Sequence, residues 1–131
     1  MSISTEYEKK ILDKVLRGED FDPPPTPYIA VHTADPEDTG EYEVTGGLYA
    51  RQAGVFAPAD DDGRTTNTNL VVIPIPDDDP EGVRVTHASV WSAVSGGSMV
   101  WSGPLDTPGG VLILPGSSLT FFEGELVVGL D

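Results

Sequence analysis

Cysteine is absent from this 131-residue sequence, so neither disulfide bonds nor a thiolate metal site can stabilise the fold. Long apolar runs are absent too, and none approaches the roughly 20 residues that a membrane-spanning helix needs. The N-terminus lacks the charged-then-apolar layout of a signal peptide, since Glu6 and Glu8 are among its first residues. We therefore expect a soluble, unprocessed chain that folds as one domain around one hydrophobic core.

Positive charge is scarce, because 7 Lys and Arg residues stand against 22 Asp and Glu residues, which gives a net charge of −15. Nucleic-acid backbones are bound by clustered cations, so this composition argues against DNA or RNA as a partner. Repulsion on such an acidic surface is smallest where concentrated salt screens it. The composition therefore indicates a halophilic source.

The few cations are unevenly placed along the chain. Residues 1–18 contain all three lysines together with Arg17 and carry a net charge of +1, whereas residues 19–131 carry −16. Lysine is a good helix former, so this segment could simply be the exposed face of a helix. The alternative is a positively charged element that docks on a partner.

An N-terminal helix is predicted for residues 5–17, because Thr5 begins a capping box and Gly18 ends the periodic pattern. Apolar residues recur every four positions, as in the buried stripe of a helix. They are Ile3, Tyr7, Ile11 and Val15, reinforced by Leu12 and Leu16. Four prolines within residues 19–27 then predict an extended, semi-rigid connector. The helical segment, residues 1–18, is expected to be a separable element.

From Tyr28 to the C-terminus, short β-type runs alternate with Gly, Pro, Asn and Asp, which is typical of an all-β sandwich or barrel. Strands are expected near residues 28–33, 49–57, 69–75, 83–92, 98–103, 110–114 and 117–129. The last run could be two strands joined at Glu123 and Gly124. Gly96 and Gly97, between two tryptophan-bearing runs, give the clearest hairpin signal. Residues 28–131 are therefore predicted to be one β-domain.

No motif in the chain indicates catalysis or a bound cofactor. His32 and His87 each lie in a β-type run, without a nucleophile elbow or a cysteine partner. The runs Asp60–Asp62 and Asp77–Asp79 lack the ligand spacing of a calcium loop. A carboxylate pair suited to glycoside hydrolysis would arise by chance among 22 acidic residues. We expect half-buried histidines, solvated aspartate turns, and no catalytic residue, cofactor or metal.

The tryptophans leave two alternatives open. Trp91 and Trp101 flank the predicted hairpin and could form a platform on which sugars stack. Aromatic pairs across a hairpin more often pack in a sandwich core or a subunit interface, which is the interpretation we favour. Arg51 also stands out, because only three arginines serve the whole acidic β-domain.

Six segments, taken in order, cover nearly the whole chain: YEKKILDKVLRG, PYIAVHTADP, EVTGGLYARQAGVFAPA, TNTNLVVIP, VTHASVWSAVSGGSMVWSGPLDTP and LPGSSLTFFEGELVVGLD. In this order they resemble a family of small tailed-phage structural proteins, variously called tail fiber or head decoration proteins. Each segment is a weak signal alone, but six in the same order are hard to obtain by chance. The triple-proline connector and the aspartate runs depart from the family pattern.

The resemblance implies a jelly-roll-like antiparallel β-sandwich after an N-terminal α-helix, no enzymatic activity, and assembly on a virion. We interpret the chain as a capsid decoration or fiber/turret-base protein on the outside of the particle. The expected partners are the major capsid protein or other virion proteins and further copies in a trimer or pentamer, not nucleic acid or membrane. Alternatives are a tail fiber or host-surface carbohydrate-binding module, and a hydrolase that depends on His87.

Two sets of residues follow from this interpretation. The residues expected to bind the partner are Tyr7, Lys10, Ile11, Lys14 and Arg17. Those expected to serve the fold or subunit contacts are Tyr49, Arg51, Trp91 and Trp101.

Overall fold

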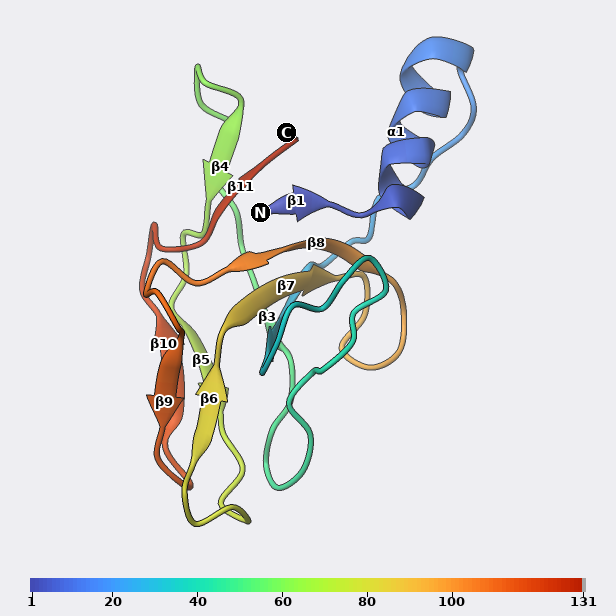
Figure 1. Cartoon of the computed structure of the whole chain (residues 1–131). Coiled ribbons are helices and arrows are strands. Elements are labelled where there is room, and N and C mark those ends of the chain that lie inside the picture. The colour runs from blue at the N-terminus through green and yellow to red at the C-terminus, as the bar shows by residue number, and fades with distance from the viewer. Residues whose placement is uncertain (131) are drawn as a thin grey trace.

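The computed structural model describes residues 1–130 and consists mostly of antiparallel β-strands with one short helix, which confirms an all-β sandwich with an N-terminal helix. Helix α1 projects from one end of the elongated β-domain (Figure 1). The elements in chain order are β1 (Ser2–Ile3), α1 (Thr5–Arg17), β2 (Tyr28–His32), β3 (Gln52–Ala53), β4 (Arg64–Thr66), β5 (Val71–Pro74), β6 (Val83–Val85), β7 (His87–Trp91), β8 (Met99–Pro104), β9 (Val111–Ile113), β10 (Ser118–Phe121) and β11 (Val127–Gly129).

Helix α1 has the predicted bounds, but Ser4 rather than Thr5 is its N-cap. The Ser4 hydroxyl accepts a hydrogen bond from the backbone amide of Tyr7 at 3.5 Å. Gly18 ends the helix at a φ of +70°, a left-handed conformation that glycine adopts without strain. Within residues 1–130, no helix is long and apolar enough to cross a membrane.

The N-terminus is tied to the β-domain before α1 begins. Strand β1 pairs antiparallel with the edge of β8, with Ile3 opposite Trp101. The Ser4 amide continues this pairing by donating a hydrogen bond to the Val100 carbonyl at 2.8 Å. The expected separable helix is therefore joined to the sheet at its first turn, and only its later turns project.

The largest sheet has the strand order β1–β8–β7–β2–β3. Strands β7 and β8 form the predicted hairpin, and both Gly96 and Gly97 in its loop have positive φ. A register shift between Val90 and Trp91 places Val90 opposite Trp101 and Trp91 opposite Met99. Because successive side chains point to opposite faces of a sheet, the two tryptophans lie on opposite faces.

Further strand pairs complete the domain: β5 with β10, β6 with β9, and β4 with β11. They supply the second layer of the main hydrophobic core, which packs against β2 and β7. Its buried residues are Ile29, Val31, Val44, Val71, Ile73, Ile75, Val85, Ala88, Val90, Ile113, Phe121 and Leu126. A smaller buried cluster consists of Ala30, Trp91 and Met99.

Several strands differ from the expected runs. The expected run 83–92 forms two strands, β6 and β7, which are separated at Thr86. Strand β6 pairs with β9, whereas β7 belongs to the largest sheet. Run 117–129 divides into β10 and β11, so the reading with two strands is confirmed. Strand β4 was not predicted, since Arg64–Thr66 lacks apolar alternation. Only Gln52–Ala53 of run 49–57 forms a strand.

Candidate functional site

Tyr7 holds helix α1 against the connector of its own chain. Its side chain is only 5% exposed and packs edge-to-face on the Phe21 ring, with the ring centroids 5.8 Å apart. The Lys10 ammonium lies 4.5 Å from the centroid of the Tyr7 ring on the helix itself. Tyr7, one of the residues expected to bind a partner, is buried in this structure, where it sets the position of α1.

The predicted docking cations lie together on one side of α1. Lys10, Lys14 and Arg17 are spaced four and three residues apart, so they share a face, which we call the cationic face. Lys10 pairs with Glu6 at 3.7 Å, and Arg17 pairs with Asp13 at 3.7 Å and with Glu19 at 3.5 Å. These pairs are exposed and add little stability. The cationic face therefore remains available to an acidic partner.

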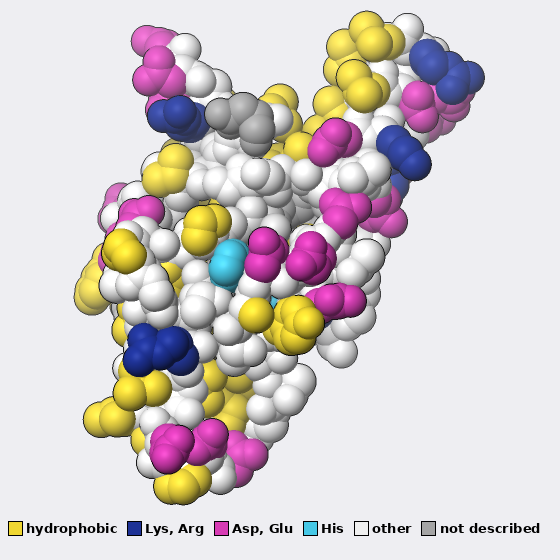
Figure 2. Space-filling view, in the orientation of Figure 1, with side chains coloured by type: hydrophobic (Ala, Val, Ile, Leu, Met, Phe, Trp, Pro, Cys, Tyr) yellow, Lys and Arg dark blue, Asp and Glu magenta, His cyan; other side chains and the backbone are white. Residues whose placement is uncertain are grey.

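A second face of α1 is apolar and exposed to solvent. Leu12, Val15 and Leu16 are 56%, 72% and 75% exposed, and their spacing of three and four residues makes them one ridge. In Figure 2 the helix projects at the upper right. Hydrophobic side chains lie along its left side, and Lys and Arg side chains lie on its right side. We call these three residues the ridge.

Beside the ridge lies an apolar groove of about 400 Å³, which we call the notch. One wall comes from α1 and the connector, through Ile11 and Phe21. The other wall comes from the β-domain, through Phe56, Trp101 and Val128. The Trp101 indole N–H is bonded to the Gly129 carbonyl at 2.8 Å, so its orientation is fixed. Ile11, another expected docking residue, is thus a wall of this groove.

The rim of the notch is formed in part by residues 57–66, a projecting hairpin that we call the β4 arm (Figure 1). Its tip carries exposed aspartates at positions 60–62. The Asp60 carboxylate accepts hydrogen bonds from the amides of Asp62 and Arg64, both at 2.9 Å. The aspartate run is therefore a turn, as predicted, and it places negative charge on the rim of an apolar groove.

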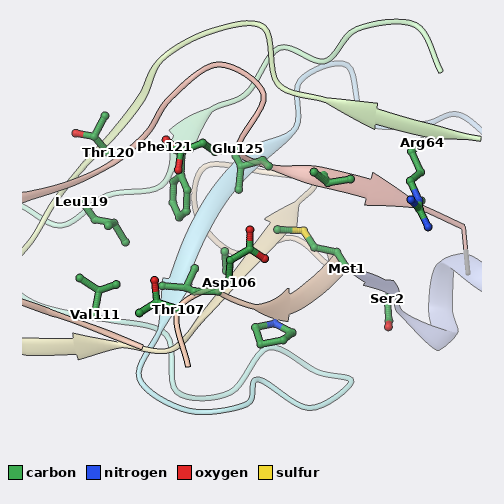
Figure 3. A pocket seen from close by; sticks show the side chains of 16 residues that line it. Met1, Ser2, Arg64, Asp106, Thr107, Val111, Leu119, Thr120, Phe121 and Glu125 are labelled. Atoms are coloured by element: carbon green, nitrogen blue, oxygen red, sulfur yellow. The ribbon is translucent and has the colours of Figure 1, made fainter. Parts of the chain in front are cut away.

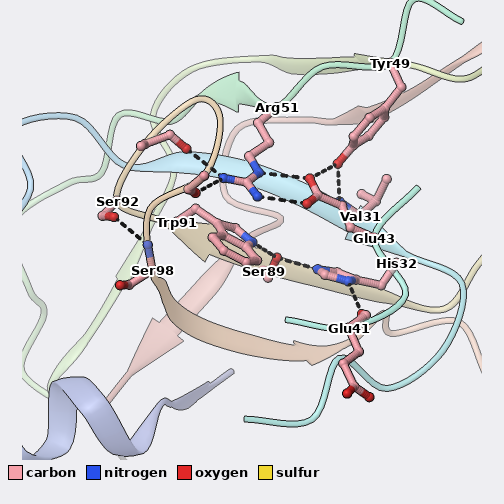
Figure 4. Close-up of polar contacts among 12 residues, drawn as sticks. Val31, His32, Glu41, Glu43, Tyr49, Arg51, Ser89, Trp91, Ser92 and Ser98 are labelled. Carbon is pink, nitrogen blue, oxygen red and sulfur yellow. Dashed lines mark hydrogen bonds and ion pairs between the residues drawn. The ribbon is translucent and has the colours of Figure 1, made fainter. Parts of the chain in front are cut away.

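Arg51 and Tyr49 meet in a buried network around Glu43 (Figure 4). The Arg51 Nε and Nη2 atoms donate to the two Glu43 carboxylate oxygens at 2.9 and 2.8 Å. The Tyr49 hydroxyl donates to Glu43 at 2.8 Å and accepts from the Val31 amide at 3.2 Å. The structure thus places Tyr49 and Arg51 in contacts within the fold.

Burial and hydrogen bonding fix the ionisation of this network. Burial raises the pKa of Glu43, but hydrogen bonds from Arg51 and Tyr49 outweigh it and hold the pKa below its ordinary value. Burial, and then the bond to Glu43, raise the pKa of Tyr49 well above its ordinary value. At neutral pH, Glu43 is therefore a carboxylate and Tyr49 a neutral donor.

His32 belongs to a second buried network. Its side chain is completely buried rather than half-buried, and its Nδ1 donates to the Glu41 carbonyl at 2.8 Å. Its Nε2 accepts from the Ser89 hydroxyl at 2.6 Å, and Ser89 accepts from the Trp91 indole N–H at 2.8 Å. Burial lowers the pKa of His32, so the ring is neutral. This serine–histidine pair is closed to substrates.

The tryptophans do not form a sugar-binding platform. Trp91 is 7% exposed and packs with Ala30 and Met99, whereas Trp101 packs against the main core on the opposite face of the sheet. Each indole N–H is bonded within the chain. The interpretation of both as packing residues of the fold agrees with this arrangement, and Trp101 additionally forms a wall of the notch.

A more polar pocket of about 570 Å³ lies beside β10 and the loop after β8 (Figure 3). Met1, Asp106, Phe121 and Glu125 are among its lining residues. The Glu125 carboxylate already accepts a hydrogen bond from the Phe122 amide at 2.8 Å. No histidine lines this pocket, and across residues 1–130 no three His, Cys, Asp or Glu side chains are grouped to hold a metal ion. We assign no chemistry to it.

Sequence reasoning missed Glu43 and Ser89, which complete the two buried networks. Glu43 lies eight residues before Arg51 and belongs to no recognisable motif. The only available signal was the scarcity of arginine, since a buried guanidinium requires a carboxylate partner. Ser89 is one of many serines, and only the pairing of β2 with β7 brings it to His32.

A family described as Podophage GP4 fiber I protein gp80 matches residues 2–129. The match includes α1, the connector and every strand from Ser2 to Gly129 among the residues that the structure describes. No curated protein matches the chain.

Proposed function

Because the chain belongs to the family of the podophage GP4 fiber I protein gp80, we propose that it is a fiber subunit held on the outside of a tailed-phage particle by helix α1. A phage fiber family places the protein in the virion and gives it a structural role there. We propose further that it has no enzymatic activity. Its partner in this proposal is the major capsid protein or another virion protein with an acidic surface.

The cationic face of α1 is the observation that carries this proposal. It projects from a molecule whose remaining residues, 19–131, carry a net charge of −16. Lys14 is exposed and has no ion-pair partner within residues 1–130. Such charges orient an acidic partner and raise the association rate. Since β1 fixes the first turn of α1 to β8, the cationic face is presented in one orientation.

Incorporation of variants into particles tests the attachment. Lys14→Glu should reduce the copy number in purified particles by about tenfold, which corresponds to about 1.4 kcal/mol of binding free energy. Arg84→Glu is the matched control, because it reverses one exposed charge on β6, in the β-domain and outside α1. Lys14→Glu protein that melts normally and still enters particles at the normal copy number would show that attachment lies elsewhere.

The copy number of the unaltered protein distinguishes a fiber from the capsid decoration or turret-base protein that the sequence suggested. A decoration protein covers a repeating capsid lattice, so hundreds of copies are expected per particle. A fiber requires only a few to a few dozen copies. Mass spectrometry of purified particles measures this number directly.

A further inference from the structure

We propose that the notch receives helix α1 of a second copy of this chain, with Leu12, Val15 and Leu16 of the ridge as the inserted residues. This self-assembly contact goes beyond attachment to the particle. It uses a different side of α1 from the cationic face, so one helix can serve both contacts.

The ridge and the notch match in their apolar character. The three ridge residues are more than half exposed, although aliphatic side chains of this size are normally buried. The notch wall of Phe56 and Trp101 offers aromatic surface to receive them. An exposed apolar patch of this kind on a soluble chain marks an interaction surface.

The ridge cannot fill the notch of its own chain. Ile11 and Tyr7 of the same helix already form a wall of that groove, and a helix cannot occupy a groove that it encloses. The bond from Ser4 to Val100 and the packing of Tyr7 on Phe21 fix the helix in this position. The ridge is therefore covered only by a second molecule.

Pairing of Lys9 with the aspartates of the β4 arm is our reason for choosing another copy of this chain as that molecule. Lys9 lies two helical turns before Leu16 and so borders the ridge, and within residues 1–130 it has no ion-pair partner. Ala59 and Gly63 of the β4 arm line the notch, and the exposed aspartates 60–62 lie between them at the tip of the arm. A helix that enters the notch ridge-first brings Lys9 towards these aspartates.

Each copy both donates a helix and offers a notch. Contacts of this kind close into a pair or a ring, or extend into an open filament, depending on the rotation between copies. An assembly would then present several cationic faces together, and their combined attachment would be stronger than that of one copy. Self-assembly and attachment would reinforce each other.

Light scattering of the full chain over a concentration series is the first test. Wild type should form an oligomer whose dissociation constant rises at least about tenfold in the double variant Leu12→Ser/Leu16→Ser. The matched control is Val94→Ser/Leu114→Ser, which removes two apolar residues that are also more than half exposed and lie elsewhere. Wild type that stays monomeric up to about 1 mM, or an oligomer unaffected by the ridge variant, overturns the proposal.

Charge exchange tests the identity of the rim. Lys9→Glu and Asp61→Lys should each weaken the oligomer, and the double variant Lys9→Glu/Asp61→Lys should restore it. Asp61 suits this exchange because Asp60, not Asp61, provides the hydrogen bonds of the turn. Failure of the double variant to recover, with both single variants folded, overturns the docking of α1 beside the β4 arm.

The absence of cysteine allows a direct test by cross-linking. Leu16→Cys protein mixed with Ala59→Cys protein should form a disulfide between copies under oxidising conditions, since Ala59 lines the notch. Leu16→Cys mixed with Val94→Cys is the control. Exclusive cross-linking of Leu16→Cys to itself would mean that two ridges pair with each other, and would overturn the proposal.

The two proposals fail in different experiments. Loss of oligomers without loss of particle incorporation would remove only the contact between the ridge and the notch. Normal oligomers of Lys14→Glu that do not enter particles would support the cationic face as a separate attachment surface.

Discussion

The guanidinium of Arg51 lies 3.8 Å from the centroid of the Trp91 ring while it forms two hydrogen bonds with the Glu43 carboxylate. Its Nη1 atom also donates to the carbonyls of Ala93 and Gly96 at 2.9 and 2.8 Å. The Arg51 side chain thus connects the segment before β3 with the Trp91 ring at the end of β7 and with the β7–β8 loop. Among residues 1–130, no buried side-chain nitrogen or oxygen lacks a hydrogen-bond partner.

Replacing Arg51 with methionine should lower the free energy of unfolding by about 3 kcal/mol, because Glu43 loses its partner in a largely buried position. Urea unfolding measures the change. The control Arg84→Met, at an exposed site, should change stability by no more than about 0.5 kcal/mol. Adding Glu43→Gln to Arg51→Met should recover part of the loss, and a loss below about 1 kcal/mol in the single variant would contradict this account.

Gly40 leaves room for the Trp91 ring, so Gly40→Ala should destabilise the fold more than Gly63→Ala does. A Cβ at Gly40 would overlap the ring, whereas a Cβ at Gly63 would meet nothing within 4 Å. Both residues have positive φ, so Gly63→Ala measures the backbone cost of about 1 to 2 kcal/mol alone. Gly40→Ala should cost a further 1 to 3 kcal/mol or so from overpacking. Equal losses in thermal unfolding would contradict the packing of Trp91.

Stability should decrease as the pH falls below about 6.5, the ordinary pKa of histidine. Burial lowers the pKa of His32, so the unfolded chain takes up a proton that the folded chain does not. The neutral His32 ring contributes its full stabilisation at pH values above the pKa of this residue in the unfolded chain. That contribution is lost as the pH falls towards the lower pKa of His32 in the folded chain. The slope of unfolding free energy against pH should approach about 1.4 kcal/mol per unit. His32→Asn should remove this slope.

The melting temperature should rise steeply between about 0.1 M and 2 M NaCl, because salt screens the repulsion that a charge of −16 on residues 19–131 produces. The variant Asp61→Asn/Asp78→Asn removes two exposed charges and should show a smaller rise. Calorimetry in NaCl and in KCl measures both. A melting temperature that does not change with salt would remove the argument for a halophilic source.

The helix and the central hairpin could be predicted because their signals are local. The spacing of apolar residues in 5–17, ended by Gly18, and the Gly96–Gly97 loop each specify their element within a few residues. The cationic face follows from the helix itself, since residues spaced four and three apart, such as Lys10, Lys14 and Arg17, share a side of an α-helix.

The remaining features depend on contacts between distant residues. Nothing near Arg64–Thr66 indicates a strand, and only its partner β11 defines it. The bend at Thr86 is set by its backbone hydrogen bonds to His32 of β2 and to Leu105, which directly follows β8. The notch is lined by residues from the beginning, the middle and the end of the chain, so they share no common pattern in the sequence. Long-range pairing of this kind carries little signal in a single sequence.

The hydrogen bonds from Arg51 to the β7–β8 loop should protect this loop from proteolysis. Exposed loops with adjacent glycines are preferred cleavage sites, because a protease must draw several residues into its own groove in extended form. Here the Ala93 and Gly96 carbonyls accept hydrogen bonds from the buried guanidinium of Arg51. The loop therefore cannot enter a protease until these hydrogen bonds break. Resistance to cleavage is then governed by the free energy of local opening rather than by the composition of the loop. A virion protein exposed to host proteases would keep this loop intact for as long as its fold persists.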